Sequence, residues 1–210
     1  MICVVPIADD SKEAFMQTTN KQRTATVTLA MGAVLTALVI VLQYLGSFIR
    51  FGMFSISLVL IPIVIGAATC GPKISTWLGL VFGVVVLLSG DAAAFLTIDA
   101  VGTVLTVLIK GIACGLLAGL TYRWLEKKNR YLAVIAAAIV CPLTNTGVFL
   151  IGCFLFFFET IKAWGLEGGY ANVISYMILG LVGGNFLFEM AFNIVLSPTV
   201  VRVLSVIKKK

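Results

Sequence analysis

The sequence has no histidine and few charged residues. Only 11% of its 210 residues are Asp, Glu, Lys or Arg, against about 25% in an average soluble protein. Histidine is the commonest general base and metal ligand, and the five cysteines never form a C-x-x-C pair. A metalloenzyme and a histidine-dependent hydrolase are therefore excluded, and we predict no catalytic residues, no metal and no cofactor.

Hydrophobic residues, in contrast, are abundant. They make up 60% of the chain, and the mean hydropathy is +1.12. A membrane-spanning helix needs roughly 20 apolar residues, whereas strands of a membrane barrel are about 10 residues long and alternate in polarity. The long uncharged runs therefore predict an all-α integral membrane protein with six transmembrane helices, over residues 26–45, 55–70, 74–89, 101–123, 131–157 and 171–204.

The remaining residues divide into two tails. Residues 1–23 are predicted to form a cytoplasmic N-terminal tail, residues 24–207 the membrane domain, and residues 208–210 a basic C-terminal tail. Loops rich in Lys and Arg stay in the cytoplasm. An N-in/C-in orientation places most basic residues inside and leaves only Arg50 and Lys162 in outer loops. The net charge of +6 is thus explained by topology, and we expect no nucleic-acid partner.

Polar residues inside the apolar runs indicate function, because each costs about 2 to 3 kcal/mol or more at the bilayer centre unless it faces protein or water. Lys110 shares a helix face with Thr103 and Thr106. Further polar residues fall in the last two runs, namely Asn145 and Thr146 after Pro142, and Asn185, Glu189 and Asn193 at intervals of four. These residues predict either a polar cavity that binds a small solute or a structural ion pair between Lys110 and Glu189 with hydrogen-bonded asparagines.

Small residues four apart allow helices to approach closely in a membrane. The pairs and repeats are Ala33 with Ala37, Gly79 with Gly83, Gly111 with Gly115 and Gly119, and Gly180 with Gly184. Packing inside the chain is the simplest interpretation of each glycine pair.

Three segments resemble a known family. Residues 54–90, with the core L-I-P-I-V-I-G-A-A-T-C-G-P-K followed by W-L-G-L-V-F-G, are similar to the second and third helices of substrate-binding S components of energy-coupling-factor (ECF) vitamin transporters. Residues 110–129 (K-G-I-A-C-G-L-L-A-G-L-T-Y-R-W-L-E-K-K-N) and 141–149 (C-P-L-T-N-T-G-V-F) also resemble that family. The resemblance covers most of the chain after about residue 25.

The resemblance implies a multi-pass subunit of the cell membrane that captures a vitamin-like micronutrient at the outer face. Transport would be driven by a T subunit and two ABC ATPase subunits, and no G-x-x-x-x-G-K-[ST] phosphate loop occurs in this chain. Ala33 and Ala37 match the small-residue motif with which S components dock onto the T subunit. The loops at 46–55, 90–101 and 158–170 correspond to the family's lids over the substrate.

The predicted substrate-binding residues are Lys110, Asn145, Asn185, Glu189, Thr106 and Thr146. The sequence pattern is most similar to pantothenate-type members, and Lys110 would suit a carboxylate. Candidate aromatic residues for stacking on a ligand are Tyr44, Phe48, Phe51, Phe95, Trp164 and Tyr170. For most of them the alternative is an ordinary place at the membrane interface. Three alternatives remain: a secondary solute carrier that works without ATPases, an intramembrane enzyme that uses Glu189 and Asn193, and a purely structural membrane subunit.

Overall fold

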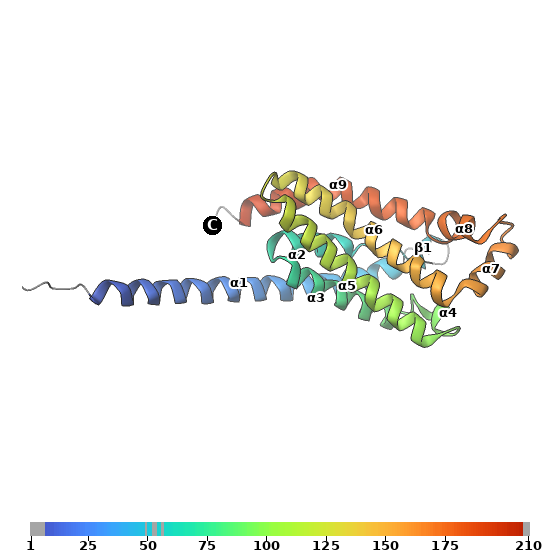
Figure 1. The fold of residues 1–210 in the computed structure, drawn as a ribbon, viewed down its shortest axis with the longest axis horizontal. Helices are drawn as coiled ribbons and strands as arrows, with labels where there is room; N and C mark the ends of the chain where they lie inside the picture. Colours follow the sequence, from blue (N-terminus) through green and yellow to red (C-terminus); the bar gives the residue numbers. More distant parts are fainter. Residues whose placement is uncertain (1–6, 49, 52–53, 56, 208–210) are drawn as a thin grey trace, which may run out of the picture.

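A computed structural model describes the backbone of residues 7–48, 50–51, 54–55 and 57–207, and the side chains within 25–48, 55 and 57–202. The chain is almost entirely helical (Figure 1). The elements in order are α1 (Ile7–Ser47), β1 (Arg50–Phe51), β2 (Phe54–Ser55), α2 (Leu60–Thr69), α3 (Pro72–Leu88), α4 (Ala93–Leu96), α5 (Ala100–Leu125), α6 (Arg130–Phe156), α7 (Phe158–Glu167), α8 (Val173–Ser175), the π-helix η1 (Tyr176–Leu181) and α9 (Gly183–Ile207).

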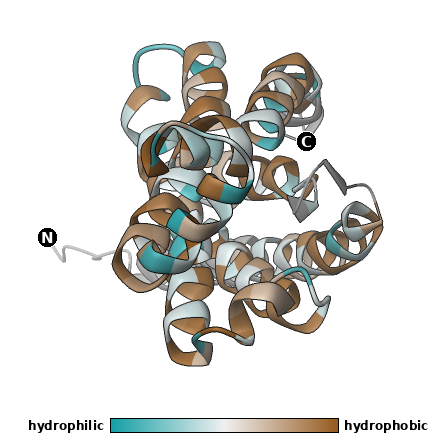
Figure 2. Cartoon of the chain, turned by 90° about the vertical axis from the view of Figure 1, so that its right-hand side faces the viewer, coloured by the Kyte–Doolittle hydropathy of each residue, from teal (hydrophilic) through white to brown (hydrophobic). Residues whose placement is uncertain are grey.

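Four helical segments are long and apolar enough to cross a membrane: 25–47 of α1, all of α5 and α6, and 183–202 of α9. The apolar helices α2 and α3 are shorter. Figure 2 looks along the bundle from the end that holds α4, α7 and α8, and hydrophobic stretches lie on its outer sides. The predicted class of all-α membrane protein is confirmed, while the count of six spanning helices and the N-in/C-in orientation stay predictions.

The structure differs from the prediction at the start of the first helix and in two of the predicted loops. The first helix begins at Ile7 and not near residue 26, so it includes most of the predicted tail. The segment 9–22 contains neither Pro nor Gly and is rich in good helix formers, so the helix continues beyond its apolar part. Short helices, α4 and α7, also occupy the predicted loops 90–101 and 158–170.

The predicted single helix over 171–204 is wrong in its first part. The chain forms α8, then the π-helix η1, and resumes a regular helix only at Gly183. This segment contains Gly180, Gly183 and Gly184, and each glycine weakens a helix by about 1 kcal/mol relative to alanine. A π-helix is often found where the regular hydrogen-bond ladder is locally disturbed.

Helices α3 and α5 approach each other closely through glycine. A Cβ atom on Gly79 would clash with the carbonyl oxygen of Gly111, and a Cβ on Gly111 would clash with that of Gly79. Gly115 likewise faces the carbonyl oxygen of Ser75. The glycine repeats of these two helices therefore pack against each other, which brings the backbone of α5 against α3.

Capping residues set the start of α5 and α6. Asp99 accepts a hydrogen bond from the Gly102 N–H at 3.0 Å at the start of α5. Asn129 accepts from the N–H groups of Tyr131 and Leu132 at the start of α6. Both side chains satisfy amides that the first helical turn leaves without partners.

The buried core has two parts. The larger lies among α1, α2, α3, α5 and α6, and includes Leu60, Leu78, Phe82 and Val134. The smaller lies near α4, α7 and η1 and contains Phe95, Phe157 and Ile161. In Figure 1 the elements of the smaller cluster lie at the end opposite the start of α1 and the end of α9.

Candidate functional site

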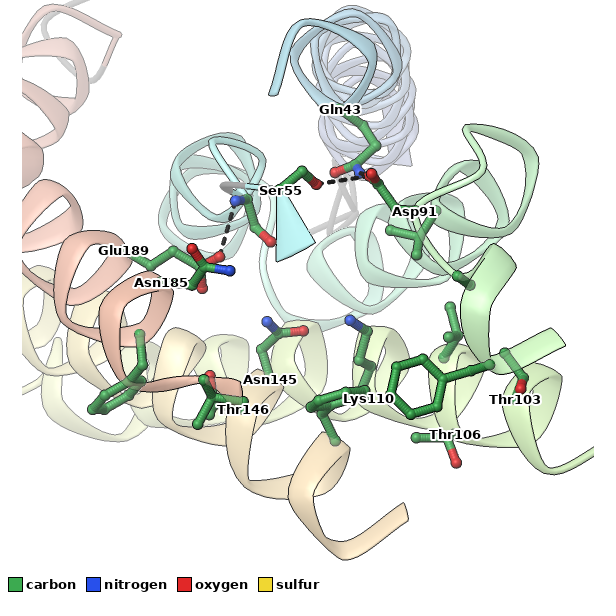
Figure 3. A pocket seen from close by; sticks show the side chains of 18 of the residues that line it. Gln43, Ser55, Asp91, Thr103, Thr106, Lys110, Asn145, Thr146, Asn185 and Glu189 are labelled. Carbon is green, nitrogen blue, oxygen red and sulfur yellow. Dashed lines mark hydrogen bonds between the residues drawn. The ribbon is translucent and has the colours of Figure 1, made fainter. Parts of the chain in front are cut away.

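A pocket opens between the two parts of the core (Figure 3). The empty space inside it and at its open mouth is about 740 Å³. Its polar and charged lining comes from α1, the β2 end of the hairpin, the chain before α2, the α3–α4 connection, α5, α6 and α9, and consists of Gln43, Ser55, Ser57, Asp91, Thr103, Thr106, Lys110, Asn145, Thr146, Asn185 and Glu189.

Lys110 supplies a positive charge to the pocket from α5. Its Nζ atom lies 5.5 Å from the centre of the Phe82 ring and 5.3 Å from that of Phe149. Aromatic faces at such distances attract an ammonium group. Within the described part of the chain, Nζ contacts these two rings and no hydrogen-bond acceptor is found for it.

Two threonines lie beside Lys110 on α5. The Thr103 hydroxyl donates to the carbonyl oxygen of Asp99 at 2.6 Å, within its own helix. The Thr106 Oγ1 atom is buried and has no hydrogen-bond partner among the described residues. Gly152 of α6 makes room for this side chain, because a Cβ there would clash with Thr106.

Helices α6 and α9 contribute two amides and a carboxylate. Asn145 and Asn185 are buried, and within the described part of the chain neither Oδ1 atom has a hydrogen-bond partner. Glu189 is also buried, and its Oε1 accepts a hydrogen bond from the backbone N–H of Ser57 at 2.9 Å. Figure 3 shows Asn145 between Glu189 and Lys110.

The opposite wall is formed by α1, the hairpin and the α3–α4 connection. The Asp91 Oδ2 atom accepts hydrogen bonds from Gln43 Nε2 at 2.7 Å, from the Ser55 hydroxyl at 2.8 Å and from the Ser89 hydroxyl at 3.2 Å. Gln43 is only 1% exposed. Asp91 thereby joins three segments of the chain around the mouth of the pocket.

All six residues predicted to bind substrate line this one pocket. Asn193 does not line the pocket. Its side-chain amide donates to the carbonyl oxygen of Glu189 at 2.8 Å. The contacts described for Lys110 and Glu189 are to aromatic rings and to Ser57, and among the described residues no ion pair joins the two. The structural ion pair is therefore the less favoured of the two interpretations.

The aromatic lining was predicted less well. Of the six aromatic residues proposed for stacking, Phe95 lines the pocket, with Phe149, Phe157 and Phe186 beside it. Phe95 packs edge-on against Phe157 and Trp164, at ring-centre distances of 4.9 and 5.8 Å. Phe48 is 84% exposed, and the side chain of Phe51 lies outside the described residues.

Four polar residues of the pocket were missed by sequence reasoning, namely Gln43, Ser55, Ser57 and Asp91. Gln43 carried a usable signal, because it is a strongly polar residue within an apolar run. The other three lie in segments between helices, where polar residues are ordinary. Only the folded chain shows that they reach the same pocket.

The pocket has no arrangement typical of a metal centre. Within the described residues, no group of three or more His, Cys, Asp or Glu side chains is placed to hold a metal ion. Instead, buried oxygen atoms without partners lie beside a cation and aromatic rings. Buried polar groups in native proteins are nearly always paired, so these atoms are suited to hydrogen bonds with a polar solute.

The fold and pocket together define a helical membrane protein with a polar pocket inside its helical bundle. The family model for the substrate-specific component of ECF transporters matches residues 27–201. The chain belongs to this family, whose members are transporter subunits and not enzymes. No curated protein and no solved structure matches the chain.

Proposed function

We propose that this protein captures a vitamin-like micronutrient in the pocket around Lys110 and delivers it to an ATP-driven ECF importer in the cell membrane. The observation that carries the proposal is that four helices contribute to one pocket polar atoms that have no hydrogen-bond partner among the described residues. These atoms are Gln43 Oε1, Thr106 Oγ1, Asn145 Oδ1 and Asn185 Oδ1.

Leaving such atoms unpaired in a buried site costs about 1 to 3 kcal/mol each. A protein that only needed a stable bundle would gain stability from apolar residues at these positions. A bound solute with polar groups offsets the cost, which favours a binding subunit over a purely structural one.

Lys110 is the proposed partner of an anionic group on the substrate. A carboxylate would form a charge-assisted hydrogen bond with its ammonium group. Among the described residues, Nζ contacts the rings of Phe82 and Phe149 and no hydrogen-bond acceptor, which supports this role. Asn145, Asn185, Thr106, Thr146 and Glu189 would contact the polar remainder. A pantothenate-type substrate stays a prediction from the sequence.

The proposed partners are a T subunit and two ABC ATPase subunits. Ala33 and Ala37 are both exposed on α1 and lie one helical turn apart. Small residues on an exposed helix face allow another helix to approach closely. This placement supports α1 as the docking face for the T subunit.

The experiment is mass spectrometry of small molecules that co-purify with the protein in detergent, followed by thermal-shift measurements with a panel of vitamins. We expect one organic solute to bind the wild-type protein and to be lost from Asn145→Leu. The matched control is Thr69→Val, because the Thr69 hydroxyl bonds within its own helix and lies outside the pocket.

Failure of every vitamin to bind, with no co-purifying solute, would contradict the proposal. Uptake by cells that lack the T subunit and ATPases would instead favour a secondary carrier. Retention of the solute by Asn145→Leu would place the binding site elsewhere in the protein.

A further inference from the structure

The orientation of the Gln43 amide is determined by its neighbour. The oxygen and nitrogen of an amide are usually interchangeable in position, and their assignment depends on the hydrogen-bond network. An ionised carboxylate only accepts hydrogen bonds, and Asp91 Oδ2 lies 2.7 Å from one end of the Gln43 amide. That end must therefore be the NH₂ group.

It follows that the other end of the amide is an acceptor. Gln43 Oε1 is buried, lines the pocket and has no hydrogen-bond partner among the described residues. Neighbouring Ser55 does not satisfy it, because its hydroxyl donates to Asp91. Among the described residues, the side-chain amides of Asn145 and Asn185 have no such carboxylate partner, so their orientation is not determined in this way. Gln43 is therefore the amide whose acceptor oxygen is assigned.

Gln43 and Lys110 face the pocket from opposite sides, one from α1 and the other from α5 (Figure 3). Lys110 donates hydrogen bonds and Gln43 Oε1 accepts them. A solute that satisfies both must therefore carry an acceptor or anion at one end and a donor at the other.

We infer that the substrate carries an O–H or N–H donor that binds Gln43 Oε1, in addition to a carboxylate at Lys110. Asp91 is the positioning residue that directs this oxygen into the pocket. The substrate thus belongs to the class of hydroxy, amino or amido acids. This inference rests on the proposed function of the pocket.

The test compares pairs of probe molecules by isothermal titration calorimetry on the full-length protein in detergent. The probes are pantothenate, biotin and folate, each beside analogues in which one O–H is replaced by hydrogen or one N–H by oxygen or CH₂. For wild type, removing the donor that faces Gln43 should weaken binding about 10-fold to 100-fold.

Variants identify the residues behind this discrimination. For each protein, the measured ratio is its affinity for the intact probe divided by its affinity for the analogue without the donor. Gln43→Met should bind both probes as weakly as wild type binds the analogue, so its ratio falls to about one. Asp91→Asn should reduce the ratio, because an amide beside Gln43 no longer imposes one orientation. Lys110→Met should weaken both probes equally and leave the ratio unchanged. The control on the same helix is Thr36→Val, because Thr36 lies outside the pocket. Its hydroxyl donates to the carbonyl oxygen of Gly32 and accepts from Trp77 Nε1 of α3.

Each outcome separates the two proposals. The inference is overturned if wild type binds each intact probe and all of its donor-lacking analogues equally. This result requires no variant and does not contradict the proposed function. An undiminished ratio in Gln43→Met overturns it as well. If wild type binds none of the three intact acids, the inference fails. The proposed function fails as well only when no vitamin of the panel binds and no solute co-purifies.

Discussion

Replacing Lys110 by methionine separates binding from folding. The substitution removes the charge of the pocket's lysine and nearly keeps its length. If the ammonium binds the carboxylate of a substrate, its removal should cost about 1.5 to 3 kcal/mol of binding free energy, the scale of a hydrogen bond to a charged group. The dissociation constant should therefore rise about 10-fold to 150-fold.

The same substitution should have little effect on the protein without ligand. The contacts of Lys110 Nζ with the rings of Phe82 and Phe149 are worth about 0.5 kcal/mol each if water reaches them and about 2 kcal/mol each if desolvated. A methionine sulfur near these rings recovers about 0.3 to 1.5 kcal/mol per contact and avoids burying a charge. We expect the free energy of unfolding to change by about 1 kcal/mol or less.

The assay uses detergent-purified wild type and Lys110→Met. It measures their affinity for each carboxylate-bearing vitamin and for the primary carboxamide of that vitamin. It also measures the melting temperature of each protein without ligand. Wild type should prefer the acid, and Lys110→Met should bind acid and carboxamide alike. The reasoning is refuted if the variant keeps the preference for the acid. It is also refuted if the unliganded variant melts far below wild type, because Lys110 would then be structural.

Three further substitutions test other parts of the molecule. The double variant Ala33→Trp, Ala37→Trp should bind ligand normally yet lose ATP-dependent uptake and capture of the T subunit, because bulky side chains keep another helix from approaching α1. Gly79→Ala should lower the free energy of unfolding by about 1 to 3 kcal/mol or more in a thermal or denaturant assay, since the new Cβ would clash with the Gly111 carbonyl oxygen. Asn129→Ala should lower it by about 1 kcal/mol in the same assay, through loss of the cap of α6.

Controls distinguish these effects from general damage. Gly147→Ala is matched to Gly79→Ala, because a Cβ at Gly147 has no heavy atom within 4 Å, and it should not destabilise the protein. Equal stability of Gly79→Ala and wild type would show that α3 and α5 are not held in close contact. Normal uptake by the alanine-to-tryptophan double variant would place the docking face elsewhere. Unchanged stability of Asn129→Ala would mean that the cap adds nothing.

Much of the site was predictable because a polar residue in a membrane-spanning run must face protein or water and not lipid. Lys110, Asn145, Asn185 and Glu189 lie in the runs that became α5, α6 and α9, and burial in protein was the expected outcome for each. That constraint alone does not require them to meet in one pocket, since Asn193 of α9 is buried as well and lies outside it. The sequence pattern did not identify the hydrogen-bond partner of Glu189, which is the backbone of Ser57.

The sequence by itself determined that this is an all-helical membrane protein, because the free energy of transfer into lipid depends on composition and run length, which are local properties. The break at η1 was not predictable in the same way, since hydropathy does not distinguish a regular helix from a π-helix. Only the tertiary structure decided that Gln43 meets Asp91 and that Phe149 lies over Lys110. Those contacts join residues far apart in the chain, and they depend on how closely α3, α5 and α6 pack, which glycines and side-chain shapes control jointly.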